Sequence, residues 1–70
     1  MRRNFDAQLA RFLRNARGDL SYAQFAKKTG ISHTTLHRIE RREHHLTLHK
    51  LEGVLDKLKL HLRDVFPNEF

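Results

Sequence analysis

A short segment around residue 37 carries side chains suited to binding a polyanion. They are His33, Thr34, His37, Arg38 and Arg41. Leu36 and Ile39, three residues apart, would give a helix here an apolar inner side. At about 100° per residue, Thr34, Arg38 and Arg41 point directly away from that side, and the two histidines flank it. We therefore predict a helix whose outward face is entirely polar and mostly cationic.

The histidines also require a test for metal binding. His33 and His37 stand four residues apart, as do His45 and His49, and this spacing can place two imidazoles on one metal ion. The chain has no cysteine, and no carboxylate stands at the spacing of a third ligand. We therefore expect no physiological metal site, and only adventitious nickel or zinc binding remains as an alternative.

Catalytic groups are missing from the sequence as well. There is no Ser/His/Asp order, no glycine-rich loop for a phosphate, and no pair of carboxylates in an apolar setting. We expect a protein that is not an enzyme and has no cofactor.

Composition indicates a small, basic, folded domain. The chain has 70 residues, a formal net charge of +6 and 39% hydrophobic residues, too many for a disordered basic tail. No linker divides the chain, so residues 1–70 are expected to form one domain. No apolar run approaches about 18 residues and no signal peptide follows Met1, so we expect a cytoplasmic protein without a membrane partner.

Periodicity predicts an all-α fold of five helices. The first should span about 5–17, the second should end near Thr29, and the third should span 33–41. A fourth should run from 48 to about 58, and a last short one should begin near 62 and be closed by Pro67. No stretch alternates with period two for long enough to be a strand.

Local signals mark where these helices begin and end. Asn4, Ser32 and Thr47 are candidate N-caps, and Ser21 with Gln24 fits a capping box. Gly18 and Gly30 are placed to end the first two helices.

The apolar residues should form one core. We expect Phe5, Phe12 and Phe25 to be buried, along with a leucine stripe that begins at Leu48 and packs on helices one and three. The stripe lasts under two heptads, too short for a coiled-coil seam. Gly53 within it predicts close packing or a bend.

Two short helices joined by a tight glycine turn, the second one cationic, have the geometry of a helix-turn-helix at about residues 21–41. The stretch from Ser21 to Glu40 resembles the phage repressor and Cro family, also called the XRE family. The family has a small residue at Ala26, glycine at Gly30, a hydrophobe and serine at 31–32, and Ile-Glu at 39–40. Leu13-Arg14 and residues 47–65 resemble its flanking helices, so the resemblance covers roughly residues 9–66.

The resemblance implies a five-helix, lambda-repressor-like DNA-binding domain with its third helix in the major groove. It implies that the base-facing residues are Ser32, His33, Thr34, His37 and Arg38. The chemistry of the side chains is compatible, because an arginine can pair bidentately with guanine O6 and N7. We expect phosphate contacts from Tyr22, Gln24, Arg41, Arg42 and His44. Arg17 and Lys28 are weaker candidates for the same role.

Two further expectations come from the resemblance. In this family a salt bridge between the residues that match Arg14 and Glu40 ties helix one to helix three, so neither is counted as a DNA contact. Arg42 stands where the family usually has glycine, which predicts either strain at Arg42 or a longer third helix.

These observations predict a sequence-specific regulator of transcription that binds double-stranded DNA. We expect a repressor that acts as a homodimer on a palindromic operator, without a small-molecule ligand. Its dimer contacts would come from helices four and five, the loop around Leu46 or the tail 68–70. An antitoxin-type or adaptor module on the same fold is one alternative, and sequence-independent architectural DNA binding is another.

Overall fold

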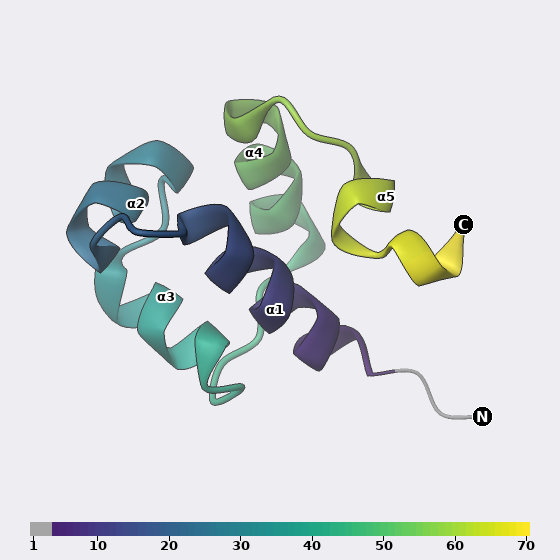
Figure 1. The fold of residues 1–70 in the computed structure, drawn as a ribbon, viewed down its shortest axis with the longest axis horizontal. Helices are drawn as coiled ribbons and strands as arrows, with labels where there is room; N and C mark the ends of the chain where they lie inside the picture. Colours follow the sequence, from purple (N-terminus) through teal and green to yellow (C-terminus); the bar gives the residue numbers. More distant parts are fainter. Residues whose placement is uncertain (1–3) are drawn as a thin grey trace.

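The computed structural model describes residues 4–70, whose regular secondary structure is entirely helical and which contain no strand. The helices are α1 (Phe5–Arg17), α2 (Tyr22–Thr29), α3 (His33–Glu40), α4 (Leu48–Leu58) and α5 (Leu62–Val65), and a 3₁₀ turn, η1 (Pro67–Glu69), follows them (Figure 1). The prediction of an all-α fold of five helices is confirmed. The third helix ends one residue earlier than expected, with Arg41 as its C-cap.

The predicted caps explain why the helices begin where they do. The side chains of Asn4, Ser32 and Thr47 accept hydrogen bonds from backbone N–H groups three residues ahead, at 3.0, 3.2 and 3.1 Å. Ser21 and Gln24 form the reciprocal capping box, with bonds of 3.1 and 2.9 Å. Each such cap contributes about 1 kcal/mol, which matters in a chain this short.

The turn between α2 and α3 depends on glycine. Gly30 has a φ of 81° and lies in the left-handed region, where side chains are disfavoured. A Cβ at this position would also meet Nζ of Lys57, the end of a flexible side chain that reaches the turn from α4 and would have to move aside. Beside it, Ile31 is buried and donates its N–H to Thr29 Oγ1 across 3.2 Å. The turn therefore has one conformation and sets the angle between α2 and α3.

One hydrophobic core joins the first four helices and α5. Its largest fully buried side chains are Leu13, Phe25, Leu36, Ile39 and Val54. In this packing α3 lies against both α1 and α2. Helix α4 lies mainly against α2, which corrects the expectation that its leucine stripe packs on helices one and three. The helix-turn-helix is thus packed against α1 through α3 and against α4 through α2.

Two expectations about burial in the core are wrong. Phe5 is 48% exposed and Leu48 is 81% exposed, because each stands in the first turn of its helix, beyond the reach of the central core. Of the two expectations for Gly53, close packing is wrong, because there is open space where a Cβ would stand.

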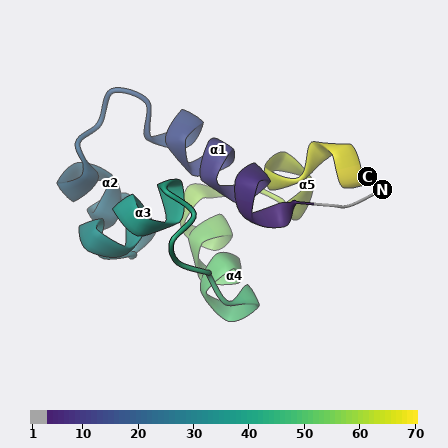
Figure 2. The same ribbon diagram turned by 90° about the horizontal axis from the view of Figure 1, so that it is seen from below.

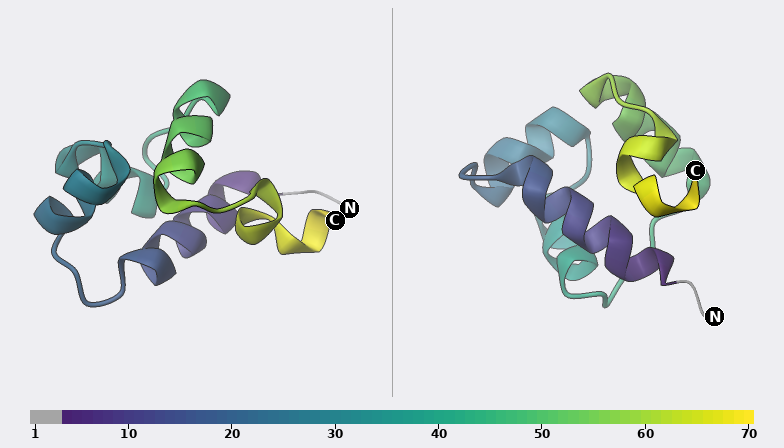
Figure 3. Two further views of the ribbon diagram at one scale, coloured as in Figure 1. Left: turned by 90° about the horizontal axis from the view of Figure 1, so that it is seen from above. Right: turned by 45° about the vertical axis from the view of Figure 1, so that its right-hand side comes forward.

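The helices are arranged so that the two ends of the molecule differ. In Figures 1 and 3, α1 begins at the end formed by α5 and the C-terminus and runs to the end formed by α2 and α3. Among residues 4–70, no helix has the length and apolar character needed to cross a membrane.

Candidate nucleic-acid interface

The outward side of α3 is open to solvent. His33, Thr34, His37 and Arg38 are all exposed, whereas Leu36 and Ile39 on the opposite side are buried. Seen from below in Figure 2, α3 lies toward the viewer with α2 behind it, and no other described helix crosses in front. The residues predicted to face a base edge therefore share one exposed surface, which we call the α3 face: Ser32, His33, Thr34, His37 and Arg38.

Ser32 caps the N-terminus of α3 as well as lying on the α3 face. Its Oγ accepts a hydrogen bond from the Thr35 N–H at 3.2 Å and donates one to Thr35 Oγ1 at 2.9 Å. A bond from Ser32 to a ligand would have to share this oxygen. His33 and Thr34 lie in the first turn of α3, where unpaired backbone N–H groups and the helix dipole favour an anion.

The residues predicted to contact phosphate lie around the α3 face on several elements. Gln24 is exposed at the start of α2, where its side chain is engaged in the capping box. His44 is exposed and lines an open groove of about 460 Å³ between the starts of α3 and α4. Ser32 and Thr47, the two N-caps, line the same groove. The N-termini of α3 and α4 and the imidazole of His44 therefore all border this groove.

Lys50 is a residue that sequence reasoning missed. It lines the groove beside His44, in the first turn of α4. A signal for it was present, because Lys50 stands three residues after the N-cap Thr47, and a cation there can reach the same anion as the free N–H groups of that turn.

Arg41 and Arg42 end α3 in an unusual way. The Arg42 N–H donates to Ile39 O at 2.9 Å, and the Glu43 N–H donates to Arg38 O at 2.8 Å. These two bonds form a Schellman motif, in which the residue corresponding to Arg42 is usually glycine. Arg42 adopts the left-handed conformation of this motif, with a φ of 61°. The sequence predicts either strain at Arg42 or a longer third helix. The structure shows the strain, and α3 ends at Glu40. Arg41 lies beside it and pairs with Glu43 at 3.2 Å.

A buried carboxylate lies directly behind the α3 face. The side chain of Glu40 is 2% exposed and accepts hydrogen bonds from Arg17 Nε at 3.0 Å, Arg17 Nη2 at 3.2 Å and the Tyr22 hydroxyl at 3.1 Å. Arg14 comes within 3.7 Å but is 67% exposed. The expected salt bridge from helix one to helix three is therefore present, but its principal cation is Arg17. This engagement corrects the interpretation of Arg17 as a phosphate contact.

These contacts shift the ionisation of both partners. Burial by itself would raise the pKa of Glu40, but the hydrogen bonds from Arg17 and Tyr22 outweigh burial, and the pKa is lowered. The hydrogen bond to Glu40 raises the pKa of Arg17. The pair is therefore fully ionised at neutral pH.

Tyr22 connects this buried network to the surface. The Arg17 guanidinium lies over one face of the Tyr22 ring, 4.2 Å from the ring centroid, in a cation–π contact. It also meets the His37 ring edge to face, with centroids 5.4 Å apart. Because its hydroxyl donates to Glu40, Tyr22 can approach a phosphate only with the edge of its half-buried ring or by sharing that hydroxyl. It is well placed to hold His37 in one orientation.

The histidines at four-residue spacing are also candidate metal ligands. Within residues 4–70, no group of three or more His, Asp or Glu side chains is arranged to hold a metal ion. His45 Nδ1 instead lies 3.2 Å from Asp6 Oδ1, linking the loop before α4 to α1.

Comparison with known proteins gives one result. The model of a family described as a helix-turn-helix domain matches residues 7–65, from the first turns of α1 to the end of α5. No curated protein and no solved structure matches the chain.

Proposed function

Because the chain belongs to the family of helix-turn-helix domains, we propose that it is a sequence-specific regulator of transcription of the phage repressor and Cro type. It binds double-stranded DNA in the cytoplasm, represses transcription, and has no catalytic role. The observation that carries the proposal is the α3 face, a solvent-exposed row of hydrogen-bonding and cationic side chains on a helix held rigidly from behind.

In this mode of binding α3 enters the major groove and α2 crosses the phosphate backbone. Thr34 and Arg38 point away from the buried side of α3 and meet base edges. His37 lies beside them, and Ser32 and His33 contribute from the start of the helix. Arg38 is the strongest candidate for direct readout, because its guanidinium can donate two hydrogen bonds to one guanine. The specificity therefore depends chiefly on Arg38.

Phosphates on either side of the groove fix the position of α3. On one side we place Gln24 and Tyr22 at the start of α2. On the other we place the end of α3, with Arg41 and Arg42, and the groove that His44 and Lys50 line. Contacts to phosphate supply affinity and orientation, and contacts to bases supply sequence preference.

A single α3 reads only a few base pairs, so the operator should be palindromic and occupied by two copies. Two half-sites about 10 base pairs apart, centre to centre, would place both α3 helices on one side of the duplex. An operator that overlaps a promoter would then exclude RNA polymerase. No small-molecule signal is needed for this mechanism.

Selection of duplexes from a random pool by the purified protein, followed by sequencing, tests the proposal. We expect an enriched palindrome that is bound at least about 10³-fold more tightly than random duplex. Equal affinity for selected and random duplexes would indicate architectural DNA binding. Absence of DNA binding would favour the adaptor or antitoxin alternative.

A further inference from the structure

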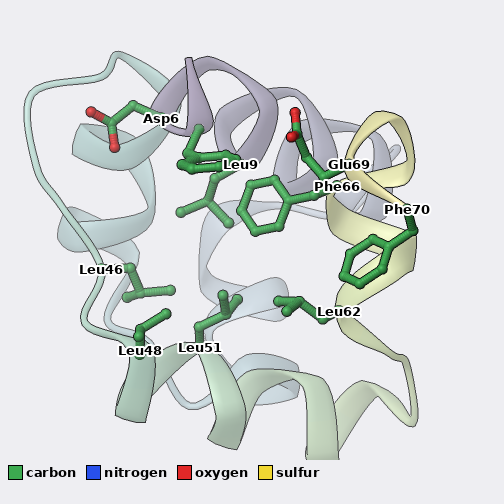
Figure 4. A pocket seen from close by; sticks show the side chains of 10 residues that line it. Asp6, Leu9, Leu46, Leu48, Leu51, Leu62, Phe66, Glu69 and Phe70 are labelled. Atoms are coloured by element: carbon green, nitrogen blue, oxygen red, sulfur yellow. The ribbon is translucent and has the colours of Figure 1, made fainter. Parts of the chain in front are cut away.

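The exposed apolar side chains of this protein gather at one place. Among residues 4–70, four large hydrophobic side chains are exposed: Phe5 at 48%, Leu48 at 81%, Leu62 at 43% and Phe70 at 76%. They come from α1, α4, α5 and the end of the chain, yet all four line the same cavity, which has a volume of about 330 Å³. Figure 4 labels Leu48, Leu62 and Phe70 around this cavity. We call these four side chains the apolar face.

The floor of the cavity belongs to the core. Leu9 and Leu51 are buried beneath it, and Phe66 packs its ring against Phe5, with centroids 5.2 Å apart. The apolar face is therefore a continuation of the hydrophobic core that no element among the described residues covers. Contiguous exposed patches of this kind mark interaction sites in soluble proteins.

The shape of this surface suits a second copy of the same surface. Leu48 and Phe70 are largely exposed beside a hollow that they help to line, as Figure 4 shows. A cavity of roughly 150 Å³ lined by apolar side chains already binds benzene, so the hollow has room for one phenyl ring. In a twofold interface each copy presents the same exposed side chains and the same cavity to its partner. Phe70 of one copy can then enter the hollow of the other, and the exchange occurs twice.

The charge of this surface also favours a second copy. The protein carries a net charge of +6, which opposes association of two copies through most of the surface. The residues that line the cavity include no lysine or arginine. Its two acidic residues are engaged within the chain, Asp6 with His45 at 3.2 Å and Glu69 with Gln8 Nε2 at 3.4 Å. Two copies can therefore meet here without placing cations against each other.

The apolar face does not compete with the DNA-binding surface. None of the residues assigned to bases or phosphates lines this cavity. We infer that the apolar face is the surface through which two copies of this chain pair when they occupy adjacent half-sites on DNA. This inference rests on the proposed function, because it names the partner that a palindromic operator requires.

The area available sets the strength of the pairing. A fully exposed aromatic side chain offers about 150–250 Å², so the four side chains together expose on the order of 400 Å² per copy. A pair would bury roughly 800 Å², well below the total of about 1,600 Å² in a standard stable interface. The free protein is therefore mostly monomeric at low concentration, and a duplex with two half-sites supplies the effective concentration that completes the pair.

Cooperative DNA binding provides the first test. Affinity is measured for a duplex with one selected half-site and for a duplex with two. The double variant Leu48→Asn, Phe70→Ser keeps the net charge, and Ala16→Ser, an exposed position on α1 away from the cavity, is the matched control. We expect wild type and the control to bind the second half-site about tenfold or more tightly than the first. The double variant should lose this gain and change its affinity for one half-site by less than about twofold.

A second test does not use DNA. At about 1 mM protein, sedimentation equilibrium should show reversible dimers of wild type, and isotope-filtered NOEs between labelled and unlabelled copies should connect Phe70 to Leu48 or Leu62. Intermolecular NOEs from another surface would overturn the inference. So would full cooperativity in the double variant, or independent binding of half-sites by a wild type that stays monomeric at this concentration. If dimers form through the apolar face but no duplex is selected, the proposed function fails and this interface stands.

Discussion

The guanidinium of Arg17 holds the carboxylate of Glu40 with two hydrogen bonds, of 3.0 and 3.2 Å, and so joins α1 to the last residue of α3. The Tyr22 hydroxyl adds a third bond from α2. Because Glu40 is buried directly behind the α3 face, this cluster fixes the helix that carries the candidate DNA contacts. It costs the burial of a charge, which the three bonds offset.

Replacing Glu40 should therefore lower stability in a pH-dependent way. Glu40→Gln should reduce the free energy of unfolding at pH 7 by about 1–3 kcal/mol, because it leaves the Arg17 guanidinium without its charged partner. The folded protein lowers the pKa of Glu40 below its ordinary value of 4.5. Its stabilising contribution is thus complete above that pH and is lost as the pH falls through the pKa of the folded state.

Urea unfolding of wild type and Glu40→Gln between pH 7 and pH 3, followed by circular dichroism, measures this difference. The two proteins should converge in stability as the pH falls below about 4.5. Tyr22→Phe, which removes only one hydrogen bond, should cost about 1 kcal/mol and provides a folded comparison if Glu40→Gln is largely unfolded. A difference between wild type and Glu40→Gln that does not change with pH would contradict the role assigned to the ionised carboxylate.

Removing the guanidinium of Arg38 should relax specificity at one base pair. Arg38→Ala should lower discrimination there by about 1–3 kcal/mol and leave preferences at other positions intact. Repeating the duplex selection with this variant and with Arg63→Ala on α5 measures the effect. If the Arg38 variant keeps the full preference profile of wild type, the assignment of Arg38 to base readout is wrong.

Arg42 should show a conflict between stability and DNA binding. Arg42→Gly should stabilise the fold by roughly 0.5–1 kcal/mol, because glycine adopts a φ of 61° without a steric penalty. It should also weaken binding to all duplexes and reduce the slope of log K against log salt by about one unit. Thermal unfolding and salt titrations of DNA binding measure the two effects.

Lys59→Gly is the matched control for Arg42→Gly. Lys59 also has a positive φ, 57°, at the end of α4, and it carries the same charge away from the candidate interface. It should give a similar gain in stability with an unchanged salt slope. Equal slopes for both variants would show that Arg42 does not contact phosphate.

Gly53 offers a substitution that should stabilise the protein. It lies within α4, and a Cβ there would meet no other atom within 4 Å. Gly53→Ala should therefore raise the free energy of unfolding by about 0.5–1 kcal/mol. Gly18→Ala is the contrast. Gly18 has a φ of 56°, and a Cβ there would make only an ordinary contact with Asn15 O at 3.9 Å, so the backbone conformation alone should make this substitution destabilising. A loss of stability in Gly53→Ala, measured by thermal unfolding, would mean that this glycine has a role beyond the contacts described.

Much of the candidate interface was predictable because it depends on local chemistry. The caps Ser21, Ser32 and Thr47 act within three residues, and Gly30 acts within one turn, so the chain order alone specifies the helix-turn-helix. The polar outward side of α3 follows from the positions of Leu36 and Ile39 on a helix with 3.6 residues per turn. These features need no knowledge of what the helices pack against.

Tertiary structure decided those contacts for which the sequence offered several residues at equally suitable positions. Arg14 and Arg17 stand three apart on one side of α1, so periodicity could not choose which one reaches Glu40. Phe5 and Leu48 continue apolar stripes, but a stripe shows only which side of a helix is apolar and not how far a neighbouring helix covers it. The sequence alone thus determined the helices and the outward side of α3. The partner of Glu40 and the apolar face depended on where α1, α4 and α5 lie relative to one another, which only long-range packing specifies.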